Sequence, residues 1–196
     1  MGKNRLPALR RDQLSPAGQA AWDLVVETRG SRVVTGEGTL SGPFNAFVHA
    51  PDVGRQLASL GAVLRFGTSL ENRLTELAII TVAARWRAEY ERMAHARLAR
   101  EAGVPDAAVD AIGRGEEPPL TAEDEKTVYA AARQLADSGH LSDAAYDAAK
   151  GLLGDAGVVE LVALCGYYTT VSFILNSFEV PLPPGAQPMW PDSQPG

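Results

Sequence analysis

Hydrophobic and polar positions along this chain repeat with a helical period, and no stretch alternates with the period of two that a strand requires. Proline, glycine and capping residues divide the pattern into separate helices. These are expected at 17–29, 51–66 and 69–86, then in a segment that holds Glu91 and His95 and ends at Gly103. Further helices are expected at 105–113, 121–135, 142–153 and 158–178. The pattern therefore predicts an all-α fold in which the helices pack as a bundle.

Side-chain caps are expected at three of these helix starts. Ser15 precedes Pro16, a usual first helical residue. Thr68-Ser-Leu-Glu71 fits a capping box, and Thr121 is paired with Asp124 in a similar way. The helix that starts after Thr68 is expected to end near Trp86, although neither glycine nor proline marks that end.

The chain's 196 residues are 45% hydrophobic, enough to bury the core of a single domain. We expect a helix and loop extension over 1–40, a helical domain over 41–180 and an extended, proline-rich tail over 181–196. Trp190 is an isolated aromatic residue in that tail. One hypothesis is that it anchors the tail over the cleft of a neighbouring subunit.

Charge and cysteine content narrow the function classes. The formal net charge of −6 argues against a nucleic-acid partner, which would call for a clustered basic surface. No apolar run approaches the ~20 residues that span a bilayer, so no membrane partner is expected. Cys165 is the single cysteine, which excludes an intramolecular disulfide and favours a reducing, cytoplasmic location.

Ionisable residues interrupt the apolar pattern at two places. Glu91 and His95 lie on a face that otherwise holds small and apolar residues, and their spacing of four lets the carboxylate reach the ring. Glu76 precedes an uncharged run, so its carboxylate is expected to be desolvated and its pKa raised. We predict a proton-transfer site in which Glu76 moves a proton, His95 is the partner acid or base and Glu91 orients His95.

Several alternatives remain open from the residues alone. Glu91 and His95 could form only a buried ion pair. His49 could bond to the backbone at a helix end, or join Glu76, Glu91 and His95 in a metal site. Further candidates for substrate binding, each with a structural reading as core packing or ion pairing, are His49, Arg73, Tyr90, Tyr168 and Asn176.

Three segments carry a resemblance to a known family. They are Arg73-Leu-Thr-Glu76-Leu-Ala-Ile-Ile, Glu89-Tyr-Glu91 with His95 four residues on, and Ala99-Arg-Glu-Ala-Gly103. In these the chain resembles the carboxymuconolactone decarboxylase-like family, which also contains the alkylhydroperoxidase AhpD. The resemblance implies an AhpD-like helical bundle, a small-molecule substrate and a homo-oligomer, whether dimer-based, trimeric or hexameric.

The chain departs from the peroxidase branch of that family, whose pattern is a glutamate, Cys-x-x-Cys and a histidine. Aligned on His95, Ala88 and Glu91 occupy the two cysteine positions. Thiol peroxidase chemistry needs both sulfurs. The resemblance therefore implies the branch without a dithiol and a lyase-like, acid-base enzyme with no metal or organic cofactor. The alternatives are a peroxidase that uses Cys165, and a non-catalytic oligomer that binds a small molecule.

Overall fold

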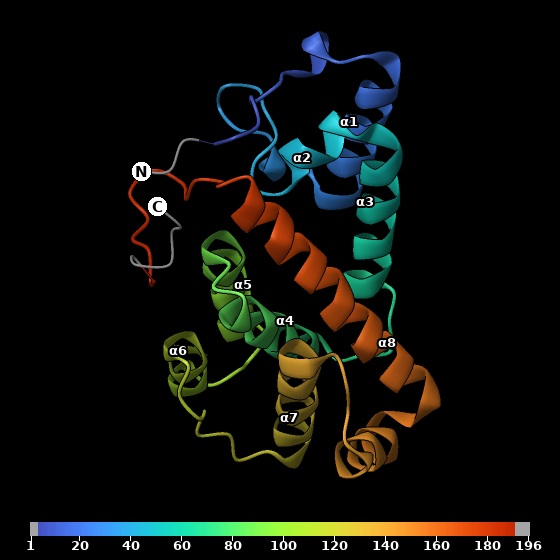
Figure 1. The fold of residues 1–196 in the computed structure, drawn as a ribbon, viewed down its shortest axis with the longest axis vertical. Coiled ribbons are helices and arrows are strands. Elements are labelled where there is room, and N and C mark those ends of the chain that lie inside the picture. The colour runs from blue at the N-terminus through green and yellow to red at the C-terminus, as the bar shows by residue number, and fades with distance from the viewer. Residues whose placement is uncertain (1–3, 191–196) are drawn as a thin grey trace. The chain divides into compact units, whose positions relative to one another are not determined.

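A computed structural model describes residues 4–190, and within them the chain folds into α-helices and two short 3-10 turns without a strand (Figure 1). The prediction of an all-α fold is therefore confirmed. The eight α-helices are α1 (Pro16–Arg29), α2 (Phe44–His49), α3 (Pro51–Phe66), α4 (Asn72–Arg85), α5 (Glu89–Glu101), α6 (Asp106–Arg114), α7 (Glu123–Ser138) and α8 (Asp143–Ser177).

The chain divides into two compact units, and the division differs from the expected one. The first unit runs to Gly67 and takes in Ile174–Pro181, so that α2 and α3 belong with α1 rather than with the later helices. Its core gathers around Trp22 and Val25 of α1 and Phe47 of α2. The second unit comprises Thr68–Phe173 and the segment from Leu182 onward.

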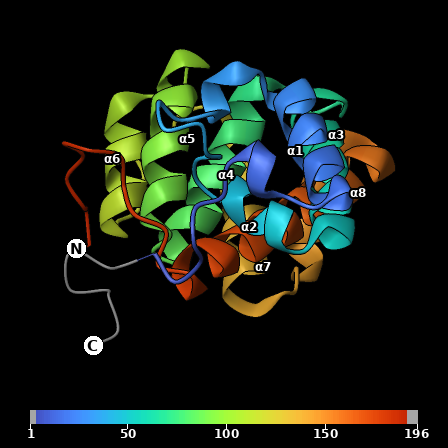
Figure 2. The same cartoon turned by 90° about the horizontal axis from the view of Figure 1, so that it is seen from above.

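The second unit is built around α4. Every residue of α4 from 74 to 83 is buried, because α5, α6 and α7 all pack against it. Figure 2 shows α4, α5 and α6 side by side in this unit. Leu77 and Ile80 of α4 join residues of α5, α6 and α7 in one apolar core. A helix buried on all sides is normally apolar throughout, so the burial of Glu76 within α4 requires a partner.

The predicted cap of α1 is confirmed, but the two threonine caps are wrong. Ser15 accepts a hydrogen bond from the backbone of Gly18. In contrast, α4 begins only at Asn72, and the N–H and hydroxyl of Ser69 both donate to Glu160, at 2.9 and 2.6 Å. A carboxylate 91 residues away thus takes the place of a local capping box.

At the second threonine site, α7 begins at Glu123, and its N-cap residue, Ala122, has no side-chain cap. Asp124, the expected partner of Thr121, instead accepts hydrogen bonds from Arg73 and from the backbone of Glu125. A long-range ion pair has therefore displaced the local contact.

The unmarked break between α4 and α5 depends on Arg87. Its φ of +49° is left-handed, a conformation that costs a residue with a side chain of the order of 1 kcal/mol. This turn ends α4 at Arg85, as expected near Trp86, and lets α5 begin at Glu89.

The most apolar helix, α8, corrects the expectation that no apolar stretch approaches the length needed to span a bilayer. Asp143–Ser177 is the one helix among the described residues that is long and apolar enough to cross a membrane by length and composition. Half of its most apolar 18-residue window is buried. Gly154, with φ of +69°, interrupts the helix between the two segments, 142–153 and 158–178, that the sequence predicted as separate helices. A core helix of a globular protein meets the same criterion, so this one is weak evidence for a span.

Trp190 docks on its own chain. Its indole N–H donates to the carbonyl oxygen of Gly113 at 3.0 Å, and the carboxylate of Glu89 accepts the backbone N–H groups of Met189 and Trp190. The described part of the predicted tail, up to Trp190, contains no helix, and positions 191–196 lie outside the described residues.

Close packing of α2 on α3 gives a first prediction. A Cβ atom on Gly54 would fall on the backbone carbonyl of Phe47, whereas one on Gly151 of α8 would meet nothing within 4 Å. We therefore expect Gly54→Ala to lower the free energy of unfolding by about 1–3 kcal/mol. Gly151→Ala, the matched control, should raise it by up to about 1 kcal/mol through helix propensity. Denaturant titration measures both, and equal effects would contradict the packing.

Candidate functional site

The candidate site is an imidazole held between two buried carboxylates. Nδ1 of His95 lies 2.6 Å from Oε2 of Glu76, and Nε2 lies 3.0 Å from Oε1 of Glu91. Glu76 comes from α4, and the other two residues lie one turn apart on α5. Glu76, Glu91 and His95 are only 1%, 4% and 6% exposed. We call these three residues the Glu-His-Glu triad.

The two carboxylates of the triad raise the pKa of the imidazole between them. Burial alone would lower the pKa of His95, but the hydrogen bonds and negative charges of Glu76 and Glu91 outweigh burial and raise the pKa above its ordinary value. In the protonated ring both N–H groups donate, one to each carboxylate. A protonated ring then offsets one of the two negative charges and donates a hydrogen bond to each carboxylate, which lowers the cost of burying them.

The sequence placed Glu76, Glu91 and His95 in one predicted site, but it predicted only one of the two contacts to the ring. The spacing of four residues correctly brought Glu91 to His95. It gave no sign that Glu76, nineteen residues earlier, bonds to the other nitrogen of the same ring. The one available signal was the placement of two unexplained acids and a histidine in neighbouring apolar helices.

Tyr168 is the one predicted substrate-binding residue that the structure brings to the triad. Its ring is buried and meets the His95 ring edge to face, with centroids 5.2 Å apart. Tyr167 packs against Tyr168 in the same way. The aromatic pair on α8 thus covers one side of the imidazole and limits the ways in which it can turn.

Arg73 has a structural role in this unit. Its guanidinium binds Glu125 at 2.7 Å and Asp124 at 2.5 Å, and so joins the start of α4 to the start of α7. Of the readings left open, pairing with acids other than Glu76 is the one observed.

The remaining candidates lie apart from these contacts. Tyr90 is half-buried on α5. His49 and Asn176 belong to the first unit, where Nε2 of His49 lies 2.9 Å from the carbonyl oxygen of Pro7. This is the backbone contact that the sequence left open for His49. Substrate binding by these three residues stays a prediction.

No group of three or more histidine, cysteine, aspartate and glutamate side chains in residues 4–190 is arranged to hold a metal ion. In the triad, both ring nitrogens of His95 already face a carboxylate oxygen. The structure therefore offers no arranged set of ligands for the predicted alternative of a metal site.

Comparison with known proteins relates part of the chain to one family. Residues 51–134, from α3 into α7, match the carboxymuconolactone decarboxylase family model. A solved structure from Ralstonia eutropha JMP134, described as an alkylhydroperoxidase AhpD core and an uncharacterized peroxidase-related protein, has a TM-score of 0.73 at 14% identity and covers 94% of this chain and 95% of that one. Over residues 51–134 the chain is therefore similar to the carboxymuconolactone decarboxylase family, and its fold is AhpD-like.

A second solved structure agrees with the fold. It is a protein of unknown function from Agrobacterium tumefaciens, linked by its description to the antioxidant defence protein AhpD. It has a TM-score of 0.64 at 16% identity over 71% of this chain and 96% of that one. No curated protein matches the chain. At these identities the two structures establish the AhpD-like fold alone.

The chain's single cysteine is poorly placed for thiol chemistry. Cys165 of α8 is 3% exposed, and burial raises its pKa to about 12. At neutral pH it is therefore a thiol rather than the thiolate that attacks a peroxide.

The contact between Glu76 and His95 can be tested by histidine titration. Glu76→Gln removes a negative charge beside Nδ1, so the pKa of His95 should fall relative to the native protein. NMR titration measures this, with His49 and His140 as internal references. Glu101→Gln is the matched control, because Glu101 is an exposed acid on α5, the helix that carries His95; this change should leave the pKa of His95 unaltered. An unaltered His95 pKa in Glu76→Gln would rule out the contact.

The raised His95 pKa also predicts a pH dependence of stability. Because the native state keeps a proton that the unfolded state releases above pH about 6.5, this stabilisation is complete below that pH and is lost as pH rises through the native pKa. The free energy of unfolding should fall there by up to about 1.4 kcal/mol per pH unit. Denaturation of His95→Gln over the same pH range should lack this slope, and an unchanged slope would contradict the assignment.

Proposed function

We propose that this protein is an acid-base enzyme that transfers protons on a small oxygenated metabolite without a bound cofactor. Decarboxylation, lactone opening and isomerisation are the reactions that such proton transfer serves. The observation that carries the proposal is the hydrogen bonding of His95 at both ring nitrogens to buried carboxylates. The match of residues 51–134 to the carboxymuconolactone decarboxylase family model supports it.

The sequence assigned proton transfer to Glu76 and the orientation of His95 to Glu91, but the burial of these side chains favours the opposite assignment. Glu76 is 1% exposed and lies behind Nδ1, where a carboxylate holds an imidazole in one orientation. Glu91 and His95 retain small exposed fractions. We therefore assign proton exchange with the substrate to the Glu91 side, and treat Glu76 as the positioning residue.

The contacts supply a simple route for a proton. Transfer of the Nε2 proton to Glu91 leaves a neutral ring whose remaining proton stays on Nδ1, facing Glu76. The protonated Glu91 can then give its proton to a carbanion or enolate of the substrate. A proton taken up by Glu91 in the reverse direction restores the imidazolium. The ring does not need to turn, since each nitrogen already faces its partner.

The peroxidase alternative has less support. The descriptions of the two structural relatives favour it at the level of the family. Against it stand the missing dithiol and the raised pKa of the buried Cys165. A carboxylate at position 91 exchanges protons but cannot form a disulfide.

The test is deuterium exchange, which detects proton transfer to a substrate even where the reaction does not go to completion. The protein is incubated in D₂O with a panel of carboxylated lactones and β-oxo acids, and NMR follows deuterium incorporation, ring opening and loss of CO₂. Glu91→Gln and His95→Gln should each slow turnover about 100-fold or more. Glu76→Gln should cost less and shift the pH profile towards acid, because it lowers the pKa of His95.

Glu101→Gln is again the control, because it removes one carboxylate from α5 outside the triad and should leave the rate unchanged. Near-normal turnover in both Glu91→Gln and His95→Gln would overturn the proposal. Binding of a panel compound without any turnover in the native protein would also overturn it, in favour of the non-catalytic reading.

A further inference from the structure

A second candidate site in the same unit is a pocket of about 380 Å³ lined by the end of α4, the end of α6, part of α7 and Trp190. Its volume falls in the range of small-molecule sites. None of the triad residues lines it. We call it the arginine pocket, after its lining residues Arg85, Arg87, Arg114 and Arg133.

The charge of this pocket is opposite to that of the protein. Four arginines line it with only two carboxylates, Glu116 and Asp137, which leaves a formal charge of +2. The whole chain carries −6. A local positive excess in an acidic protein concentrates anions from solution at that point.

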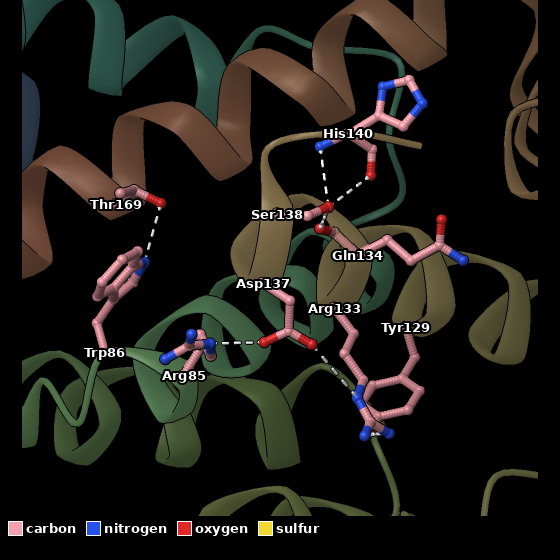
Figure 3. A network of polar contacts seen from close by, with 9 residues as sticks. All are labelled: Arg85, Trp86, Tyr129, Arg133, Gln134, Asp137, Ser138, His140 and Thr169. Carbon is pink, nitrogen blue, oxygen red and sulfur yellow. Dashed lines mark hydrogen bonds and ion pairs between the residues drawn. The ribbon is translucent and has the colours of Figure 1, made fainter. Parts of the chain in front are cut away.

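Three of the arginines are held in place by ion pairs. Figure 3 shows Asp137 between Arg85, at 2.5 Å, and Arg133, at 3.9 Å. Arg133 also binds Glu117, and Arg114 binds Glu116 at 2.7 Å. These contacts orient the guanidinium groups, and with Glu117, which pairs with Arg133 from outside the lining, the group keeps a formal charge of +1.

The fourth arginine is different. Within residues 4–190, no hydrogen bond or ion pair holds the guanidinium of Arg87, which is exposed and lines the pocket. Its backbone has the left-handed φ of +49°. The strained turn between α4 and α5 thus presents a free cation at the pocket, and strain of this kind is often kept where a side chain serves a ligand.

The aromatic walls of the pocket are fixed as well. Trp190 is anchored to Gly113 and Glu89, and the Arg92 guanidinium lies 5.7 Å from its ring centroid. Tyr129, on α7, accepts a hydrogen bond from Arg133 at 3.4 Å. Both rings offer apolar surface next to positive charge.

We propose that the arginine pocket binds a small organic dianion, namely a dicarboxylate with a compact apolar or aromatic body. The positive excess of the lining attracts carboxylates, which guanidinium groups bind with paired hydrogen bonds. The rings of Trp190 and Tyr129 take the apolar body. This site neither uses the triad nor depends on the function proposed for it.

Isothermal titration calorimetry of the full chain tests the proposal, with phthalate as the probe and neutral phthalamide as its uncharged counterpart. Phthalate should bind saturably with a Kd below about 1 mM and weaken as salt is added. Phthalamide should not bind. Arg87→Gln should weaken phthalate binding about tenfold or more, because hydrogen bonds to charged groups are among the stronger ones.

Arg97→Gln is the matched control, since it removes one exposed arginine from α5 outside the pocket and should leave the Kd unchanged. Arg114→Gln provides a second variant that should weaken binding. No saturable phthalate binding, an unchanged Kd in both pocket variants, or equal binding of phthalamide would overturn the proposal. Inorganic phosphate bound as tightly as phthalate, and lost in Arg87→Gln, would overturn the assignment to a dicarboxylate.

Discussion

The buried carboxylate of Glu76 is the constraint on which the second unit depends. It lies in a helix buried from residue 74 to 83, and an uncompensated charge in such a place costs several kcal/mol. His95 supplies both a hydrogen bond and a positive charge. The packing of α5 on α4 therefore has to present the His95 face of α5, because any other rotation would leave Glu76 without this partner.

The same compensation extends to the second acid. A protonated imidazole has two N–H groups at opposite edges, so a ring that satisfies Glu76 through Nδ1 still has Nε2 to satisfy. Glu91, one turn earlier on the same helix, does this at 3.0 Å. The three ionisable groups can thus be buried only together, because each satisfies a hydrogen bond of another. Tyr168 then closes a face of the ring, which keeps water from competing for these bonds.

Local patterns predicted what local geometry determines. The periodic apolar positions gave the helices and the all-α class, and the spacing of four gave the contact between Glu91 and His95. The failures were long-range. Glu160 replaced the cap expected from Thr68, and Arg73 took Asp124 from its expected role beside Thr121. Likewise, the bond from Glu76 to His95 depends on how two helices pack, which their separate periodicities do not encode.

The residues of the triad also determine which chemistry the shared fold can support. A cysteine at position 91 would be a redox-active thiol beside His95, whereas a glutamate there has no sulfur to oxidise and can exchange only protons. Ala88 leaves no second sulfur one turn earlier, and Cys165 is buried as an unreactive thiol. The geometry around His95 can thus be kept while electron transfer is lost. In the proposed function, these side chains hold a proton and move it between two carboxylates.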